Sequence, residues 1–237
     1  MQESAGHRLE KIVRNLSNLP SLPFIAQKLS STTEDGRAAV KDIVDIISID
    51  QSLTAKLLKL VNSSFYGFSS KVSTVSRAVV ILGMQNIKTL ALGVTVFKTA
   101  SAMSSSNAVF DLQKFWEHSL GVAAGAKLLA RFTGSKQIEE AFLGGLLHDI
   151  GKIIFNEYMP NEFSEALQMS KTQSIPLSEA ESKILKADHE IAGDYLAERW
   201  KLPLPLRRCV SQHHRPPFNE QYLPPEIIKL VAIVSLS

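Results

Sequence analysis

The apolar residues of this chain recur with the period of an α-helix. Residues 40–47 are the clearest case, because valine or isoleucine occupies positions i, i+3, i+4 and i+7. That spacing places these side chains on one helix face. No long run alternates apolar and polar residues, which is the pattern of a half-buried strand. The chain is therefore expected to be all-α.

Proline, glycine and serine divide this pattern into separate helices. Pro20 and Pro23 end the first apolar stripe, since proline cannot continue a helix. Gly83 is placed to cap the C-terminus of one helix. Ser178 and Glu181 fit a capping box, with serine at the N-cap and glutamate three residues later. Helices are expected at about residues 9–16, 24–29, 40–47, 53–62, 74–82, 85–100, 111–132, 136–149, 188–200, 204–213 and 225–237.

A stretch rich in serine and alanine, residues 100–108, is the best candidate for a boundary between two helical lobes. We therefore expect an N-terminal helical lobe over residues 1–105 and a second lobe over residues 106–237.

Most of the histidines lie in the second half of the chain, beside apolar helical stretches. These five of the six are His118, His148, His189, His213 and His214. Imidazole is the commonest metal ligand in proteins, and a carboxylate, here that of Asp149, is its usual companion. These six residues are predicted to bind one or two divalent transition metal ions, with Asp149 as the bridging candidate. Iron, manganese, zinc and nickel all suit such ligands, and no organic cofactor is expected.

Such a centre could activate water for hydrolysis, because a bound divalent cation lowers the pKa of its water. Asp149 and Lys152 are the catalytic candidates. Lys152, Arg208 and Arg215 are the candidates for binding an anionic substrate group. Each assignment has a structural alternative: a hydrogen-bonded core histidine, a lysine favoured by the helix dipole, and arginines on a solvated face.

Composition and charge argue against nucleic-acid binding, disulfide bonding and membrane insertion. The net charge of +3 is small and there is no block of like charges, so nucleic acid is only a weak third alternative as partner. A single cysteine excludes an intrachain disulfide. No apolar run is long enough to span a membrane, and residues 1–10 lack the apolar core of a signal peptide. We expect a cytoplasmic protein without membrane contact.

Four motifs resemble those of one family. Residues 145–152, GLLHDIGK, resemble the signature of the HD superfamily of metal-dependent phosphohydrolases. Residues 19–23, 57–67 and 76–83 resemble the HDOD family, the HD-related output domains of bacterial signalling proteins. The resemblance covers about residues 16–217.

This resemblance implies a helical lobe packed on an HD-like lobe, and a regulatory role exerted through a signalling protein partner. It makes His118 the first ligand and His148 with Asp149 the central doublet. His189, His213 and His214 match the later histidines of the HD-GYP phosphodiesterases.

Two features depart from the catalytic pattern. The Gly-Tyr-Pro motif is absent, and residues 232–234 are apolar where an aspartate is expected. The resemblance therefore favours a regulatory module that acts through protein interaction and keeps its metal site. The alternative is a metal-dependent phosphohydrolase acting on a phosphoester or a cyclic nucleotide.

Overall fold

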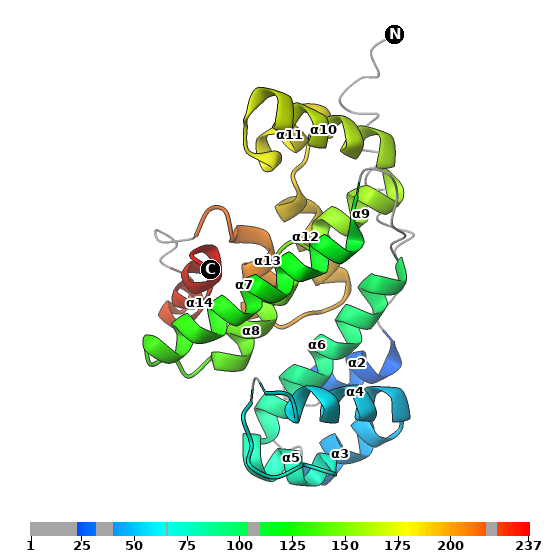
Figure 1. Ribbon diagram of the computed structural model, residues 1–237, viewed down its shortest axis with the longest axis vertical. Coiled ribbons are helices and arrows are strands. Elements are labelled where there is room, and N and C mark those ends of the chain that lie inside the picture. Colours follow the sequence, from blue (N-terminus) through cyan, green and yellow to red (C-terminus); the bar gives the residue numbers. More distant parts are fainter. Residues whose placement is uncertain (1–22, 32–39, 65, 104–109, 217–221) are drawn as a thin grey trace. The chain divides into compact units, whose positions relative to one another are not determined.

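The computed structural model describes residues 23–31, 40–64, 66–103, 110–216 and 222–237. Within these ranges all regular elements are helices, which confirms the all-α prediction (Figure 1). The expected helix at residues 9–16 and Pro20 lie outside the described residues, as does much of the predicted boundary at 100–108. No helix in the described ranges is both long and apolar enough to cross a membrane.

Contacts divide the described chain into two compact units, residues 23–99 and residues 100–237. The first unit comprises α2 (Phe24–Ser31), α3 (Val40–Ser48), α4 (Gln51–Val61), α5 (Val75–Leu82) and most of α6 (Met84–Met103). In it α3 packs on α2, α4 and α5, and its Ile43 and Ile47 are fully buried. Gly83 caps α5 with a φ of 88°, a left-handed value that glycine adopts without strain, as the sequence predicted.

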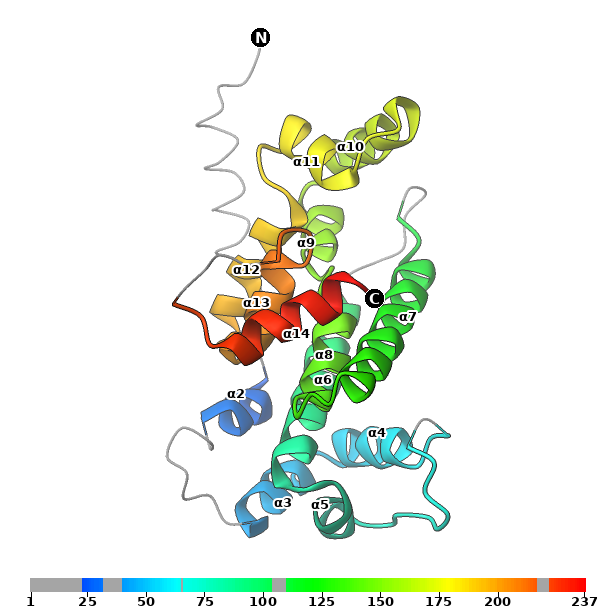
Figure 2. The same ribbon diagram turned by 90° about the vertical axis from the view of Figure 1, so that its left-hand side faces the viewer.

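The second unit carries the predicted metal ligands. Its helices are α7 (Leu112–Phe132), α8 (Ile138–Leu147), α9 (Gly151–Tyr158), α10 (Pro160–Gln173), α11 (Leu177–Ile184), α12 (His189–Arg199), α13 (Leu204–Gln212) and α14 (Pro225–Ser235). α7 and α8 lie side by side in both views (Figure 1, Figure 2), and α13 and α14 pack against α8.

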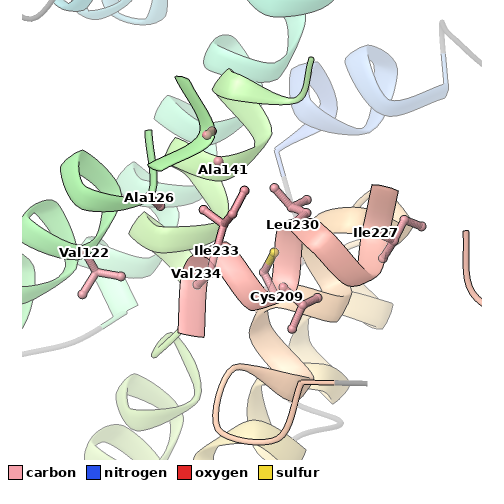
Figure 3. Close-up of a cluster of buried hydrophobic side chains, with 10 residues drawn as sticks. Val122, Ala126, Ala141, Cys209, Ile227, Leu230, Ile233 and Val234 are labelled. Atoms are coloured by element: carbon pink, nitrogen blue, oxygen red, sulfur yellow. The ribbon is translucent and has the colours of Figure 1, made fainter. Parts of the chain in front are cut away.

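Apolar side chains from these helices form one core. Figure 3 shows Val122 and Ala126 of α7 with Cys209 of α13 and with Ile233 and Val234 of α14. All of them are buried, and burial raises the pKa of the Cys209 thiol. This core holds together α7, which carries His118, and the helices α8 and α13, whose C-terminal ends precede the other candidate ligands of this region.

Two close backbone approaches position the ligand-bearing segments. A Cβ added to Gly145 of α8 would lie 2.7 Å from the Ala123 Cα of α7, so only glycine permits this contact. A Cβ added to Gly151 would lie 2.0 Å from the His189 carbonyl oxygen of α12. These approaches bring α8 against α7, and α9 against α12.

The structure corrects three sequence-based predictions. The helix expected at 136–149 ends at Leu147, and a turn at residues 148–150 precedes α9. α9 and α10 were not predicted, although Pro160 opens α10 at a position that favours proline. The capping box is also wrong: Pro176 caps α11, so Ser178 lies inside the helix, and Glu181 is wholly buried. Glu181 instead bonds to a residue of α12, so a tertiary contact overrides the local motif.

Candidate metal centre

The five predicted histidine ligands all lie around the carboxylate of Asp149, the sixth predicted ligand. His118 comes from α7, His148 and Asp149 from the turn after α8, His189 from the first residue of α12, and the last two histidines from the end of α13. They form two groups, in each of which the ligand atoms lie within 4.8 Å of one another. The first group is His118, His148 and Asp149; the second group is Asp149, His189, His213 and His214.

The two oxygens of Asp149 face different groups. Oδ2 lies 3.6 Å from His118 Nε2 and 3.2 Å from His148 Nε2. Oδ1 lies 3.3 Å from His189 Nε2 and 3.5 Å from His213 Nε2. His214 joins the second group through its Nε2, 2.9 Å from that of His189. The carboxylate is therefore placed to be shared by two cations.

Backbone carbonyls set the tautomers of two histidines. His148 Nδ1 lies 2.7 Å from the Gly145 carbonyl oxygen, and His213 Nδ1 lies 3.0 Å from that of Val210. A carbonyl oxygen only accepts hydrogen bonds, so each Nδ1 must carry the proton. In the neutral ring Nε2 then carries the lone pair and faces Asp149, which is the tautomer that a metal requires.

The carboxyl group of Glu181 orients His189 through Nδ1, as the backbone carbonyls orient the other two rings. Its Oε2 accepts the backbone N–H of His189 at 2.9 Å and lies 2.5 Å from His189 Nδ1. Burial raises the pKa of Glu181 to about 8 and lowers that of His189 to about 3. The two groups therefore share one proton. With that proton on Nδ1, the pair is the carboxylate–histidine arrangement that supports metal ligands.

The donor set fits a cation. In their neutral forms His148 and His213 turn lone pairs towards the carboxylate oxygens, and a cation bound between them would relieve that repulsion. Asp149 Oδ1 is buried and has no hydrogen-bond partner among the described residues. Burial also lowers the pKa of His214 to about 4, so protonation of this ring does not supply the charge at neutral pH. This cluster can therefore hold a metal ion.

Lys152 contacts the shared carboxylate directly. Its Nζ donates to Asp149 Oδ2 at 2.5 Å, and its side chain is largely buried. Burial by itself would raise the pKa of Asp149, but contacts with His148 and His213 and the charge of Lys152 lower it well below the usual value. Asp149 is thus ionised, and Lys152 faces the first group.

The two candidate arginines lie differently. Arg215 donates to Asp188 at 3.0 Å and lies 3.8 Å from Glu190, so it pairs with the acids on either side of His189. Among the described residues no hydrogen bond or ion pair joins Arg208 to either ligand group, and its Nε is buried without a hydrogen-bond partner. The structure therefore places Arg215 at the edge of the site and leaves Arg208 without such a contact.

Two acidic residues around the ligands were missed. Glu181 supports His189, and Glu190 accepts the backbone N–H of His214 at 2.8 Å. A signal existed for Glu181, because it stands four residues after Leu177 and four before Leu185 on an otherwise apolar helical stripe. The apolar residues at 232–234 also have an explanation: Ile233 and Val234 belong to the core, and α14 carries no carboxylate there.

The chain is similar to an uncharacterised protein and to several solved structures. An uncharacterised protein of Treponema pallidum (strain Nichols) is 26% identical over 95% of this chain, which spans only 43% of that protein. The structure of an HDOD domain protein of unknown function from Geobacter sulfurreducens matches with 27% identity and a TM-score of 0.77, covering 98% of this chain and 76% of the other. A Shewanella amazonensis SB2B structure, provisionally named a phosphohydrolase, matches with 26% identity and a TM-score of 0.75, covering 95% and 79%.

The family itself is shown by a family model that matches most of the chain. The model of the HDOD domain covers residues 19–216, in agreement with the resemblance found in the sequence motifs. This range includes every candidate ligand described above. The chain therefore belongs to the HDOD domain family.

Proposed function

We propose that this chain is a metal-dependent phosphohydrolase whose site holds two divalent transition metal ions. The observation that carries this proposal is the position of Asp149, whose two oxygens face two separate groups of imidazoles. A carboxylate shared between two ions is the usual centre of a two-metal hydrolase site.

The two groups differ in the number of ligands. The first group offers three protein ligands and so leaves a coordination position for water or substrate, as catalytic sites do. The second group offers four, as closed structural sites do. The side chain of His118 is 57% exposed, so the first group is accessible from solvent. When bound there, a divalent ion would lower the pKa of its water towards neutrality.

The remaining side chains have defined roles in this proposal. Lys152 places a positive charge beside the first group, where it would neutralise a phosphoryl oxygen. Arg215 is 73% exposed and attracts an anionic substrate towards the site. Glu181 holds the ring of His189 in place. The substrate class is therefore a phosphoester, with cyclic nucleotides included.

The test is hydrolysis by protein purified without a histidine tag and reconstituted with Mn²⁺ or Fe²⁺. Substrates would be p-nitrophenyl phosphate, its bis ester and cyclic dinucleotides. We expect metal-dependent turnover that His148→Ala abolishes. If metal-loaded protein hydrolyses none of these substrates, the proposed hydrolase function is wrong.

A second candidate is a signalling module that acts through a protein partner, with a metal site that only organises the fold. The specific observation in its favour is the apolar packing of Ile233 and Val234, which leaves α14 without the carboxylate of the catalytic HD pattern. In that case metal would raise the melting temperature of the chain without supporting turnover. Measuring both quantities on the same reconstituted sample separates the two candidates.

Glu181→Gln is expected to weaken metal binding by roughly 10–100-fold, the usual cost of losing an outer carboxylate partner of a ligand. The amide cannot accept the shared proton as a carboxylate does, so the ring of His189 is less well oriented. Competition with a chromophoric chelator would measure the affinity. Glu179→Gln, two residues earlier on an exposed part of α11, is the matched control. Equal affinities of the two variants would contradict the role given to Glu181.

A further inference from the structure

Helix α7 exposes an apolar stripe on the side opposite its core face. Leu120 is 51% exposed and Leu128 54% exposed, and Ala124 between them is also exposed. Positions four residues apart lie on one helix face, so these three side chains form a continuous surface. A Cβ added to Gly121 would meet nothing within 4 Å, so the helix surface there is open. We call residues 120, 121, 124 and 128 the α7 stripe.

The core of the second unit does not use this stripe. The other face of α7 packs on α8 and α14, with Val122 and Ala126 buried there. Leaving two leucines in water on one helix face forgoes the stabilisation of burying them. Such a patch is typical of a surface that another helix covers.

Opposite charges stand at the two ends of the stripe. Glu117 lies seven residues before Ala124 and Arg131 lies seven residues after it, and both are exposed. Positions 117, 121, 124, 128 and 131 follow the alternating spacing of four and three residues that marks the contact line of a coiled coil. The charges thus lie on the same line as Gly121, Ala124 and Leu128, and Leu120 lies beside it.

We propose that α7 pairs antiparallel with α7 of a second copy of this chain, around a two-fold axis at Ala124. In that arrangement each residue faces the one equally far on the other side of Ala124. Glu117 then faces Arg131 of the partner at both ends, and Leu120 faces the partner's Leu128. This is a self-complementary surface, as a two-fold dimer requires.

Charge selects this direction over the parallel one. A parallel pair in register would place Glu117 against Glu117 and Arg131 against Arg131, and like charges at an interface disfavour that arrangement. The small side chains at positions 121 and 124 let the two helix axes approach closely. Because Glu117 precedes His118, the interface ends beside the first ligand group. The proposal does not depend on hydrolysis.

The first test is sedimentation of the whole chain over a concentration series. The surface area buried by a single pair of helices is small for a protein–protein interface, so we expect a weak dimer. Glu117→Arg and Arg131→Glu should each raise the dissociation constant at least tenfold, because both end pairs become like-charged. The variant carrying both changes should dimerise as the unchanged chain does. Lys171→Glu, a charge reversal at an exposed position of α10, is the control.

Mixing the two single variants gives a sharper result. One copy then has arginine at both positions and the other has glutamate at both, so only the mixed dimer has complementary ends. We expect the mixture to form a heterodimer although each variant alone is monomeric. This outcome requires that residue 117 face residue 131, and a surface without that register would not produce it.

A cysteine at the axis provides an independent readout. Ala124→Cys should form a disulfide-linked dimer under mild oxidation, because residue 124 faces itself across the axis. Cys209 is fully buried and does not compete. A chain that stays monomeric at all concentrations, with no disulfide dimer of Ala124→Cys, would overturn the proposal. The proposal would also be overturned if the α7 stripe were found to be covered by another part of the chain or by a different protein.

Discussion

Asp149→Asn is expected to remove bound metal from both ligand groups at once. Each oxygen of this carboxylate faces a different group, so one substitution weakens both sites and also removes the charge that offsets Lys152. The loss should exceed the roughly 10–100-fold that the removal of an outer partner costs. Metal content of the purified protein, measured by mass spectrometry, checks the prediction.

Two variants make this result specific. Asp194→Asn makes the same chemical change at a half-buried carboxylate that pairs with Arg207 and belongs to neither ligand group, so metal content should not change. His118→Ala should weaken only the first group, since its ring contacts only Oδ2 of Asp149. Full metal content in Asp149→Asn would show that this residue is not the shared ligand.

Lys127→Met is expected to lower the free energy of unfolding by roughly 3–5 kcal/mol, the cost of breaking a buried ion pair from one side. Lys127 of α7 is 2% exposed and its Nζ lies 3.0 Å and 3.2 Å from the two oxygens of Glu139 on α8. Its ammonium also lies 5.7 Å from the centre of the Phe142 ring. The substitution leaves a buried carboxylate without its cation. Urea unfolding followed by circular dichroism measures the change.

The chain contains a matched exposed pair. Lys183 and Glu179 of α11 lie 2.7 Å apart with about half of each side chain exposed, and Lys183→Met should cost only about 0.3–0.5 kcal/mol. Combining Lys127→Met with Glu139→Leu should recover most of the loss, because apolar side chains of similar size pack well in place of a buried ion pair. A cost for Lys127→Met no larger than that for Lys183→Met would refute the prediction.

Helical periodicity was sufficient to predict the fold class and the helices at its strongest signals. Residues 40–47 and 111–132 were predicted as helices because their apolar residues share one face, and α3 and α7 lie there. α9 and α10 were not predicted, although buried residues such as Ile153, Phe155 and Phe163 recur along them. The capping box predicted at Ser178 was wrong because a local sequence motif does not reveal the distant hydrogen-bond partner of Glu181.

The candidate ligands themselves were identified from residue type and order alone. Imidazole and carboxylate groups are suited to bind metal ions, and the motif at residues 145–152 contains one of each, His148 and Asp149. What the sequence could not supply is the distribution of ligands, with Oδ2 of Asp149 towards one group and Oδ1 towards the other. That depends on how α7, α8, α12 and α13 converge.

The all-α class, the family and the side chains that can bind metal follow from the amino-acid sequence, because periodicity and residue chemistry are local properties. The tertiary structure alone decided which oxygen of Asp149 faces which imidazole, that Glu181 supports His189, and that the α7 stripe remains exposed. The physical reason is close packing. Contacts such as that of Gly151 with the His189 carbonyl join segments far apart in the chain, and no local pattern specifies them.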